Sequence, residues 1–443
     1  MPNINSFSFS GELNSPNRNR ASALAVKDIP LALYIHIPWC VKKCPYCDFN
    51  SHELPMDSQL SMYDEYVDAL LLDAASQQAL TQGREISSIF IGGGTPSLLP
   101  IIQYQRLFNG LRKTFHFAND IEVTMEANPG TLEHAPFAQY LDVGINRLSI
   151  GVQSFAAGQL TKLGRIHDPA QALSAIKVAR RAGFERVNVD LMHGLPQQTM
   201  SEALSDIQMA HDAGATHISW YQLTIEPNTV FYRSQPILPD EDSLADIEQA
   251  GQALLERLGY SNYEVSAWAG ADDKPCRHNV NYWQFGDYLA IGAGAHGKVT
   301  LNESLAQKLT ADKVSDEAFT EVSKKKGIYR FSKSRLPKDY IAFDNEPINS
   351  ANNSGEKEGA PKMVGWQAIA DDELVSEFML NALRLRAGVA WSLFEARTGL
   401  SYDSINLEVN QLIKQGLLID DNEHLQPTAL GRRYLNQILR VFL

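Results

Sequence analysis

The chain of 443 residues lacks several features that would place it in a common class of protein. No run of apolar residues reaches the roughly 20 that a membrane-spanning helix needs. Basic residues are in the minority, with 39 Lys and Arg against 52 Asp and Glu, and the net charge of −13 argues against a nucleic-acid partner. The four cysteines are too few for a disulfide framework, which favours a reducing, cytoplasmic location.

Three of those four cysteines are concentrated in one short segment. Cys40, Cys44 and Cys47 have C-x3-C-x2-C spacing directly after an apolar stretch. Three thiolates on one loop can ligate three irons of a 4Fe-4S cluster and leave the fourth iron open to a small molecule. A Cys3His zinc site that adds His52 is one alternative, and a thioredoxin-like Cys44/Cys47 pair is another. The pair leaves Cys40 without a role, and we prefer the cluster.

From residue 31 onward the chain alternates between predicted strands and predicted helices. The predicted strands are 31–37, 86–91, 121–125, 147–152, 187–192 and 217–223. The helices predicted from apolar residues at helical spacing are 58–80, 102–114, 133–143, 170–182, 200–213 and 240–258. Six such units imply parallel strands with right-handed crossovers. We therefore predict an α/β fold, a partial (β/α)6 TIM-like barrel, with a doubly wound sheet as the alternative.

The placement of the chemically unusual residues favours the barrel. The cysteines, the glycine run that begins at Gly92, Glu126, Gln153 and Asp190 all lie at or near the C-terminal ends of predicted strands. In a barrel these ends converge on one face, where the chemistry of such folds is built. We expect one site on that face.

Four segments are expected along the chain. Residues 1–29 form a flexible N-terminal segment without the apolar stretch of a secretory signal, and residues 30–300 form the barrel. Residues 301–370 are a connecting segment with a polar loop at 344–361. Residues 371–443 have helical patterning followed by a hairpin and a last helix over 428–441, which is typical of a winged-helix-like domain.

The pairing of the C-x3-C-x2-C loop with the later Gly92-Gly-Gly-Thr-Pro resembles the radical S-adenosylmethionine superfamily. In those proteins the methionine portion of S-adenosylmethionine chelates the open iron. The order of motifs over residues 31–300 is similar to the family of oxygen-independent coproporphyrinogen III oxidases (HemN) and its haem-chaperone branch. By this resemblance the residues that line the cofactor would be Tyr34, Tyr46, Gly93, Gly94, Thr95, Glu126, Gln153, Arg165 and Asp190.

The residue types suit these roles, although each residue alone has another explanation. Arg165 can pair with a carboxylate in a bidentate manner, and a carboxylate can accept hydrogen bonds from ribose hydroxyls. Taken singly, Glu126 or Asp190 could cap a helix, and Arg165 could be a solvated loop charge. Because they occur as a set at successive strand ends, the pocket is the better interpretation.

A second motif, His278-Asn-Val-Asn-Tyr-Trp, matches the HNxxYW pattern of the haem-chaperone branch. A histidine can ligate haem iron, and neighbouring aromatic rings offer flat apolar surface to a porphyrin. The alternative is a packed loop in which the aromatic side chains fill the core. The resemblance implies that the haem residues are His278, Asn279, Tyr282 and Trp283.

One departure from the oxidase pattern bears on function. Phe49 stands where the oxidases have a further cysteine, which leaves the cluster intact but argues against oxidase activity. We therefore expect a haem chaperone that carries a 4Fe-4S cluster, S-adenosylmethionine and haem, and that passes haem to an acceptor protein. A reductant for the cluster is a further expected partner. The alternative is the oxidase itself; no catalytic residue is assigned, and cofactor cleavage, peripheral membrane contact and a homodimer stay open.

Overall fold

The structure is a computed structural model that describes residues 25–54, 59–131, 137–311, 327–342, 365–421 and 423–443. The chain divides into two compact units. One unit holds Val26–Ile369 together with Arg384–Ala387, and the other includes Ala370–Leu383 and Gly388–Leu443. Most of the expected N-terminal segment and the whole polar loop at 344–361 lie outside the described residues. Within the described residues no helix combines the length and apolarity of a membrane span.

Six parallel strands form the centre of the larger unit and confirm the predicted barrel class. In spatial order they are β1 (Leu31–Ile37), β4 (Ile86–Gly93), β5 (Phe117–Ala127), β6 (Arg147–Gln153), β7 (Arg186–His193) and β8 (His217–Gln222). Spatial order follows chain order, so each strand lies next to its predecessor. A barrel winds in this way, whereas a doubly wound sheet reverses direction at a switch point.

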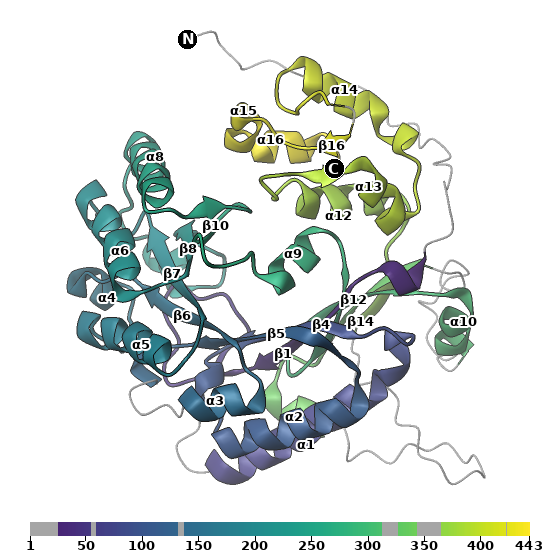
Figure 1. Cartoon of the computed structure of the whole chain (residues 1–443), viewed down its shortest axis with the longest axis horizontal. Coiled ribbons are helices and arrows are strands. Elements are labelled where there is room, and N and C mark those ends of the chain that lie inside the picture. The colour runs from purple at the N-terminus through teal and green to yellow at the C-terminus, as the bar shows by residue number, and fades with distance from the viewer. Residues whose placement is uncertain (1–24, 55–58, 132–136, 312–326, 343–364, 422) are drawn as a thin grey trace. The chain divides into compact units, whose positions relative to one another are not determined.

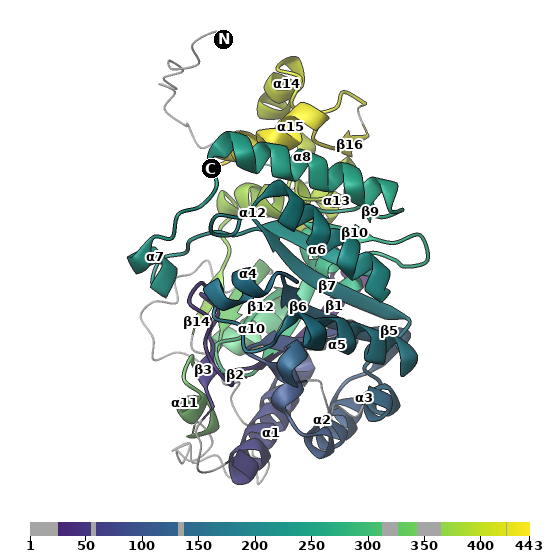
Figure 2. The same ribbon diagram turned by 90° about the vertical axis from the view of Figure 1, so that its left-hand side faces the viewer.

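Helices connect the six strands as the sequence predicts. They are α1 (Gln59–Ser76), α2 (Ile101–Thr114), α3 (Phe137–Val143), α5 (Pro169–Arg181), α6 (Met200–Ala213) and, after β8, α8 (Glu241–Arg257). Two of them start at capping boxes, Asp168 with Gln171 on α5 and Thr199 with Glu202 on α6. Each box satisfies backbone donors that the first helical turn leaves unpaired. Figure 2 shows α6 and α8 side by side on the outside of the sheet.

Further strands extend the sheet beyond both edges of the barrel. At one edge β11 (Asp287–Ile291) pairs with β1 in parallel, and β12 (His296–Leu301), β13 (Gly327–Ser332) and β14 (Gly365–Ala368) follow in antiparallel order. At the other edge β10 (Ala267–Ala269) and β9 (Ser261–Asn262) pair antiparallel to β8. The segment expected to connect the domains, 301–370, thus supplies two strands of the same sheet.

The two faces of the sheet differ in character. Alternate residues of β1, such as Leu33 and Ile35, are fully buried beneath the outer helices. The inner face is polar: the Asn188 amide on β7 donates to the Ser149 hydroxyl on β6 at 2.7 Å and to the Ser219 hydroxyl on β8 at 3.0 Å. Closed TIM barrels fill their interior with branched apolar side chains. A polar inner face is therefore suited to a ligand rather than to a packed core.

A short helix, α9 (Arg277–Trp283), occupies the concave side of this sheet (Figure 1). Its first backbone N–H groups, those of Arg277 and His278, donate to Glu122 on β5 at 2.8 Å and 3.3 Å. For the HNxxYW segment the sequence left a packed loop as the alternative to a haem site. It forms a helix inside the barrel because a buried carboxylate on a distant strand supplies the acceptor for its unpaired N–H groups.

The smaller unit has the order of elements expected of a winged-helix-like domain. Its elements are α12 (Glu373–Ala382), β15 (Val389–Ala390), α13 (Trp391–Thr398), α14 (Asn406–Lys414), β16 (His424–Leu425), α15 (Ala429–Arg433) and α16 (Leu435–Arg440). The strands β15 and β16 pair antiparallel, and the rings of Phe378 and Phe394 pack edge to face at 5.2 Å. One final helix over 428–441 was expected, and this is wrong: the chain leaves helical geometry at Tyr434 and divides it into two.

Candidate functional site

The cysteine loop follows β1 and is held by backbone hydrogen bonds. Cys40 ends β2 (Trp39–Cys40), which pairs in parallel with β3 (His52–Glu53), so the loop closes on itself (Figure 2). The Cys47 N–H donates to the Cys44 carbonyl at 3.1 Å, which gives a tight turn between the second and third thiols. All three cysteines are free thiols with partial exposure. The three predicted cluster ligands thus lie on one ordered, accessible loop.

Each thiol has a polar neighbour from the surrounding loops. The Thr95 hydroxyl donates to the Cys40 sulfur at 3.5 Å, and Arg165 Nη1 donates to the Cys44 sulfur at 3.5 Å. Burial raises the pKa of the Cys40 thiol and also that of Cys47. Iron binds the thiolate, so loading of the loop releases protons, and donors such as Thr95 and Arg165 favour the charged sulfur.

The donor set fits an iron–sulfur cluster better than a single metal ion. Among the described residues no group of three His, Cys, Asp or Glu side chains is placed to hold one ion. His52, the fourth ligand of the zinc alternative, lies 3.3 Å from the Arg335 carbonyl through Nε2. In a cubane each thiolate binds a different iron, so its three ligands need not converge on a single point. This geometry gives the zinc alternative no support.

The glycine run Gly92–Gly94, at the end of β4, forms a cradle in which a side chain has no room. A Cβ atom on Gly92 would lie 2.9 Å from Glu126 Oε2, and one on Gly94 would lie 2.5 Å from the Trp39 carbonyl oxygen. Gly93 has a φ of +115°, and a Cβ there would lie 2.5 Å from the His36 ring. These residues therefore let the backbone approach a ligand beside the cysteine loop.

One carboxylate, Glu126 near the end of β5, contacts this cradle, and a second, Asp190 on β7, is close enough to affect its pKa. Glu126 Oε2 accepts a hydrogen bond from the Gly93 N–H at 3.2 Å. Burial, and secondarily the charge of Asp190, raises the pKa of Glu126 to about 7. Asp190 accepts from the Ser149 hydroxyl at 3.0 Å and from the Asn188 amide at 2.8 Å, and burial raises its pKa too. A pair of buried carboxylates with raised pKa values is typical of a ligand site.

Arg165 and Gln153 complete the same end of the barrel. Arg165 Nη2 donates to the Gly151 carbonyl at 2.5 Å, while its buried Nε finds no hydrogen-bond partner among the described residues. Gln153 has a φ of 72°, and its amide oxygen accepts from the Tyr221 hydroxyl at 2.8 Å. A buried N–H without a partner is costly, and an anionic ligand group would satisfy it. These observations fit the carboxylate of a bound amino acid.

Tyr34 and Tyr46 stand at different places around the site. The Tyr34 hydroxyl donates to His36 Nδ1 at 3.0 Å, inside the barrel. Tyr46 belongs to the cysteine loop and packs on Phe231 at a centroid distance of 6.2 Å. Burial raises the pKa of both phenols, so both are neutral donors. The structure thus brings the predicted cofactor residues together at one end of the barrel.

His36 is a neighbour of the site that the sequence did not assign. Its Nδ1 accepts from Tyr34, and its Nε2 donates to the Asn50 carbonyl at 2.9 Å. Burial lowers the pKa of His36 to about 4, so the ring is neutral and uses both nitrogens. Its contact with the Asn50 carbonyl depends on a fold that residue spacing alone does not give.

The HNxxYW residues lie on and around α9. The His278 ring centroid is 5.2 Å from that of Phe90 and 6.5 Å from that of Tyr34, and Nδ1 lies 3.5 Å from the Ser88 hydroxyl. Burial lowers the pKa of His278 to about 4, which keeps the ring neutral and able to ligate a metal. The first residue of the motif thus faces the polar interior of the barrel.

The other motif residues, Asn279, Tyr282 and Trp283, have different neighbours from those of His278. Asn279 accepts a hydrogen bond from the Cys276 thiol at 3.5 Å, and burial raises the pKa of that thiol to about 11. Tyr282 packs on Trp283 at a centroid distance of 5.0 Å, and the Arg384 guanidinium lies 5.2 Å from the Trp283 ring centre. Cys276 is a buried neutral thiol, because burial outweighs the opposing effect of Arg147 on its pKa.

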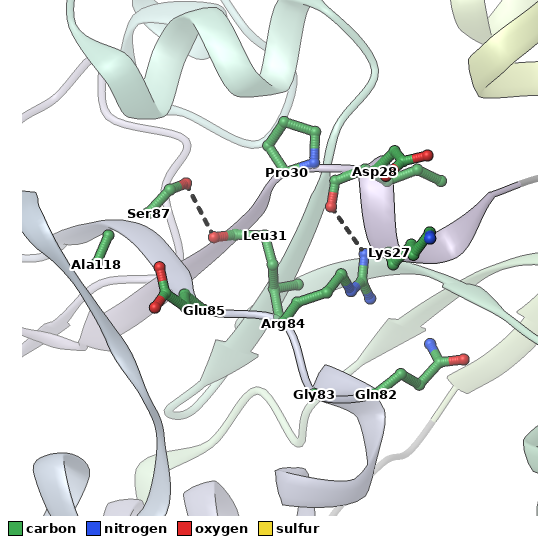
Figure 3. A pocket seen from close by; sticks show the side chains of 11 residues that line it. Lys27, Asp28, Pro30, Leu31, Gln82, Gly83, Arg84, Glu85, Ser87 and Ala118 are labelled. Atoms are coloured by element: carbon green, nitrogen blue, oxygen red, sulfur yellow. Dashed lines mark hydrogen bonds between the residues drawn. The ribbon is translucent and has the colours of Figure 1, made fainter.

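A cavity of 410 Å³ lies at the opposite end of the strands (Figure 3). It is lined by the starts of β1 and β4, including Lys27, Arg84 and Ser87, and none of the predicted site residues borders it. Arg84 already donates to the Ile29 carbonyl and pairs with buried Asp287 at 2.7 Å. Because barrel chemistry is built at the C-terminal ends of the strands, we do not assign this cavity a role in the site.

Comparison with known proteins agrees with this geometry. The family model "Radical SAM superfamily" matches residues 34–210, and the family model "HemN C-terminal domain" matches residues 369–434. The solved structure of coproporphyrinogen III oxidase (HemN) from Escherichia coli superimposes with a TM-score of 0.72 at 24% identity, and covers 94% of this chain and 90% of that one. The fold and site thus define a radical SAM protein, a class that carries a 4Fe-4S cluster and binds S-adenosylmethionine.

Similar sequences narrow this class. "Heme chaperone HemW" of Escherichia coli (strain K12) is 44% identical over 421 residues, which are 94% of this chain and 99% of that protein. The protein of the same name from Haemophilus influenzae is 42% identical over 94% of this chain and 98% of its own length, and that from Bacillus subtilis is 34% identical over 93% and 98%. The chain belongs to the HemW family.

The raised pKa of Glu126 predicts a pH-dependent affinity for the cofactor. If its carboxylate accepts hydrogen bonds from S-adenosylmethionine, binding requires the ionised form. Affinity should then be constant above the pKa of about 7 and fall about tenfold per pH unit below it. Calorimetric titration of the anaerobically reconstituted protein between pH 6 and 8 measures this. In Glu126→Gln the pH dependence should disappear, and a wild-type affinity that does not vary with pH would exclude Glu126 from this role.

Proposed function

We propose that this protein is a haem chaperone, which binds haem and passes it to an acceptor protein. The observation that carries the proposal is the 44% identity to a protein named heme chaperone HemW over almost the whole length of both chains. Identity of this extent includes both units, so it is not restricted to the barrel that all radical SAM proteins share. The conclusion therefore concerns the protein as a whole.

The cluster and cofactor would lie at the C-terminal end of the barrel strands. Cys40, Cys44 and Cys47 would hold the cluster, and the amino and carboxylate groups of S-adenosylmethionine would complete its open iron. When reduced, such a cluster supplies an electron to the bound sulfonium. The protein's own part is to hold the ligand: the Gly93 backbone and Glu126 would orient its methionine end, and Arg165 Nε would donate to its carboxylate.

Haem would be held at the HNxxYW segment. His278 is neutral and supplies a ring nitrogen that can ligate iron. Tyr282 and Trp283 offer aromatic surface next to it, and both are only partly buried. A cationic side chain, Arg384, lies over the Trp283 ring and is of the right charge to attract a haem propionate. The segment therefore combines an iron ligand, apolar surface and a positive charge.

The second candidate function is the oxidative decarboxylation of coproporphyrinogen III. It is favoured by the likeness to the HemN structure, but at 24% identity that likeness concerns the fold. Phe49 replaces the further cysteine of the oxidases, and its side chain is 65% exposed beside the cysteine loop. An anaerobic assay with reduced cluster, S-adenosylmethionine and coproporphyrinogen III separates the two. Formation of protoporphyrinogen IX would overturn the chaperone proposal as the sole function.

The finer expectations about partners and location belong to the same proposal. A cytoplasmic protein of this kind requires a reductant for the cluster and an acceptor for the haem. A homodimer and contact with a membrane surface are compatible with the described residues, in which every helix is too short or too polar to span a membrane. Haem transfer to a candidate acceptor in the presence and absence of vesicles tests the acceptor and the membrane contact.

The role of the motif can be tested by replacing its histidine. His278→Ala should weaken haem affinity at least about tenfold, because loss of an iron ligand costs more than 1.4 kcal/mol of binding free energy. His296→Ala is the matched control, since His296 is exposed on β12 and should leave the affinity unchanged. The measurement is a haem titration followed in the Soret region. Equal haem affinities of wild type and His278→Ala would remove the motif from the proposed site.

A further inference from the structure

Phe90 lies between the expected cofactor pocket and the haem motif. Its ring stacks on Tyr34 at a centroid distance of 6.4 Å and an interplanar angle of 19°. On the cofactor side, a Cβ atom added to Gly92 would lie 3.1 Å from Phe90 Cε1 and 2.9 Å from Glu126 Oε2. Phe90 thus borders the glycine cradle at the point where the backbone must approach a ligand.

His278 completes an aromatic triangle with the same two rings. Its centroid lies 5.2 Å from Phe90, at an interplanar angle of 35°, and 6.5 Å from Tyr34. A third neighbour of the His278 ring is Ser88, on the same strand as Phe90; its hydroxyl lies 3.5 Å from His278 Nδ1. His278, the first residue of the haem motif, therefore forms one wall with Tyr34 and Phe90, and Phe90 also borders the glycine cradle.

The start of α9 is fixed to the barrel, so His278 cannot move independently of it. Glu122 accepts from the backbone N–H groups of Arg277 and His278 and from Arg186 Nη1. Arg186 also donates to Asp273 and to the Lys274 carbonyl, which clamps the segment that leads into the helix. A change in the position of the His278 ring must therefore be accommodated at Phe90 and Tyr34 rather than by displacement of the helix start.

We propose that haem at the motif and S-adenosylmethionine in the pocket bind antagonistically, because both depend on the Tyr34–Phe90–His278 wall. This rests on the proposed function. The His278 ring is only partly exposed and packs on Phe90. A porphyrin that ligates iron through this ring would press it against Phe90, the same ring that borders the glycine cradle where the methionine end of S-adenosylmethionine would lie. Thermodynamic linkage requires the two effects to be equal. The factor by which bound cofactor lowers the affinity for haem is the factor by which bound haem lowers the affinity for the cofactor.

The test compares two haem titrations of the anaerobically reconstituted protein, one without and one with saturating S-adenosylmethionine. The cluster is left oxidised so that the cofactor is not cleaved. We expect the cofactor to weaken haem binding about tenfold, within the usual range for coupled sites. Unchanged or tighter haem binding would overturn the antagonism and leave the chaperone proposal intact. Absence of saturable haem binding in both titrations would overturn both.

Two variants test whether the weakening of haem binding by S-adenosylmethionine depends on the Tyr34–Phe90–His278 wall. Phe90→Leu removes the ring that contacts both His278 and the glycine cradle, and should reduce the ratio of the two haem affinities to less than about threefold, below the coupling usual for linked sites. Phe108→Leu is the matched control, since Phe108 is a buried ring on α2 outside the barrel, and should keep the wild-type ratio. Loss of the ratio in both variants, or in neither, would contradict the assignment to Phe90.

A second measurement needs no haem. Because S-adenosylmethionine should hold the wall in place, its addition should slow amide hydrogen exchange of residues 277–283. The exchange of α12, in the other unit, serves as the internal control and should not change. Unaltered exchange of 277–283 at saturating cofactor would contradict the shared wall, whatever the haem titrations show.

Discussion

Cys44→Ala should abolish the iron–sulfur cluster, so that iron and sulfide after anaerobic reconstitution fall to background. Cys44 is the central cysteine of the three, and Arg165 approaches its sulfur at 3.5 Å from the opposite loop. Two thiolates leave two irons without protein ligands, and a cubane held so weakly is lost on desalting. The measurement is chemical analysis of iron and sulfide, together with the visible absorption of the reconstituted protein.

Cys276→Ser is the matched control for this loss. Cys276 is the fourth cysteine of the chain and is completely buried, where it donates to Glu122 at 3.4 Å. Serine preserves the donor and nearly preserves the size, so the cluster should form normally. Retention of iron and sulfide in Cys44→Ala, or their loss in Cys276→Ser, would contradict the assignment of Cys40, Cys44 and Cys47 as the ligands.

Asp73→Asn should lower the free energy of unfolding by about 3–5 kcal/mol, the usual cost of leaving a buried charge without its partner. Asp73 lies on α1 and pairs with Lys333 at 2.6 Å, and both side chains are fully buried. The Tyr340 hydroxyl donates to the same carboxylate at 2.7 Å. The pair connects the first barrel helix to the segment after β13, so the loss concerns the extended part of the sheet. Chemical denaturation measures it.

A double variant separates the buried charge from loss of packing. Lys333→Met alone should also lower the free energy of unfolding, because it leaves the buried Asp73 carboxylate without its cation. In Asp73→Asn/Lys333→Met no charge is buried, so a substantial part of the stability should return. Additive losses in the double variant would show that the two side chains do not act as a pair.

The barrel was predictable because its strands are short apolar runs bounded by turns. The bounds of β1 and α6 agree with the predicted 31–37 and 200–213 at both ends. Strand β5 begins four residues earlier than expected, at Phe117, because residues 117–120 are only partly buried or exposed and Phe117 alone among them pairs with β4. Periodicity detects the buried part of a strand and misses its exposed extension.

The cluster and cofactor residues were predictable for a different reason. Parallel strands place their C-terminal ends on one face, so Glu126, Gln153 and Asp190 had to converge once the alternation was recognised. Their roles as cofactor ligands stay predictions. Ser51 and His36 were not found because one contacts Cys47 across the cysteine loop and the other reaches the Asn50 carbonyl. Contacts of this kind leave no periodic signal.

The position of α9 could not be predicted from local sequence. HNxxYW has no helical capping residue of its own: its N-cap is Cys276, without a side-chain cap, and Glu122 from another strand accepts the free N–H groups. Strands β13 and β14 were missed for a similar reason, since their pairing joins residues far apart in the chain. Long-range partners decide both features.

The central claim is that this radical SAM barrel carries haem. Anaerobic reconstitution followed by haem titration, with the full optical spectrum recorded, tests it most directly. We predict a 4Fe-4S absorption that persists while a saturable Soret band develops, and a Soret band that shifts to that of the haem-loaded acceptor when apo-acceptor is added. A protein that forms its cluster yet shows only non-saturable haem absorption would contradict the claim.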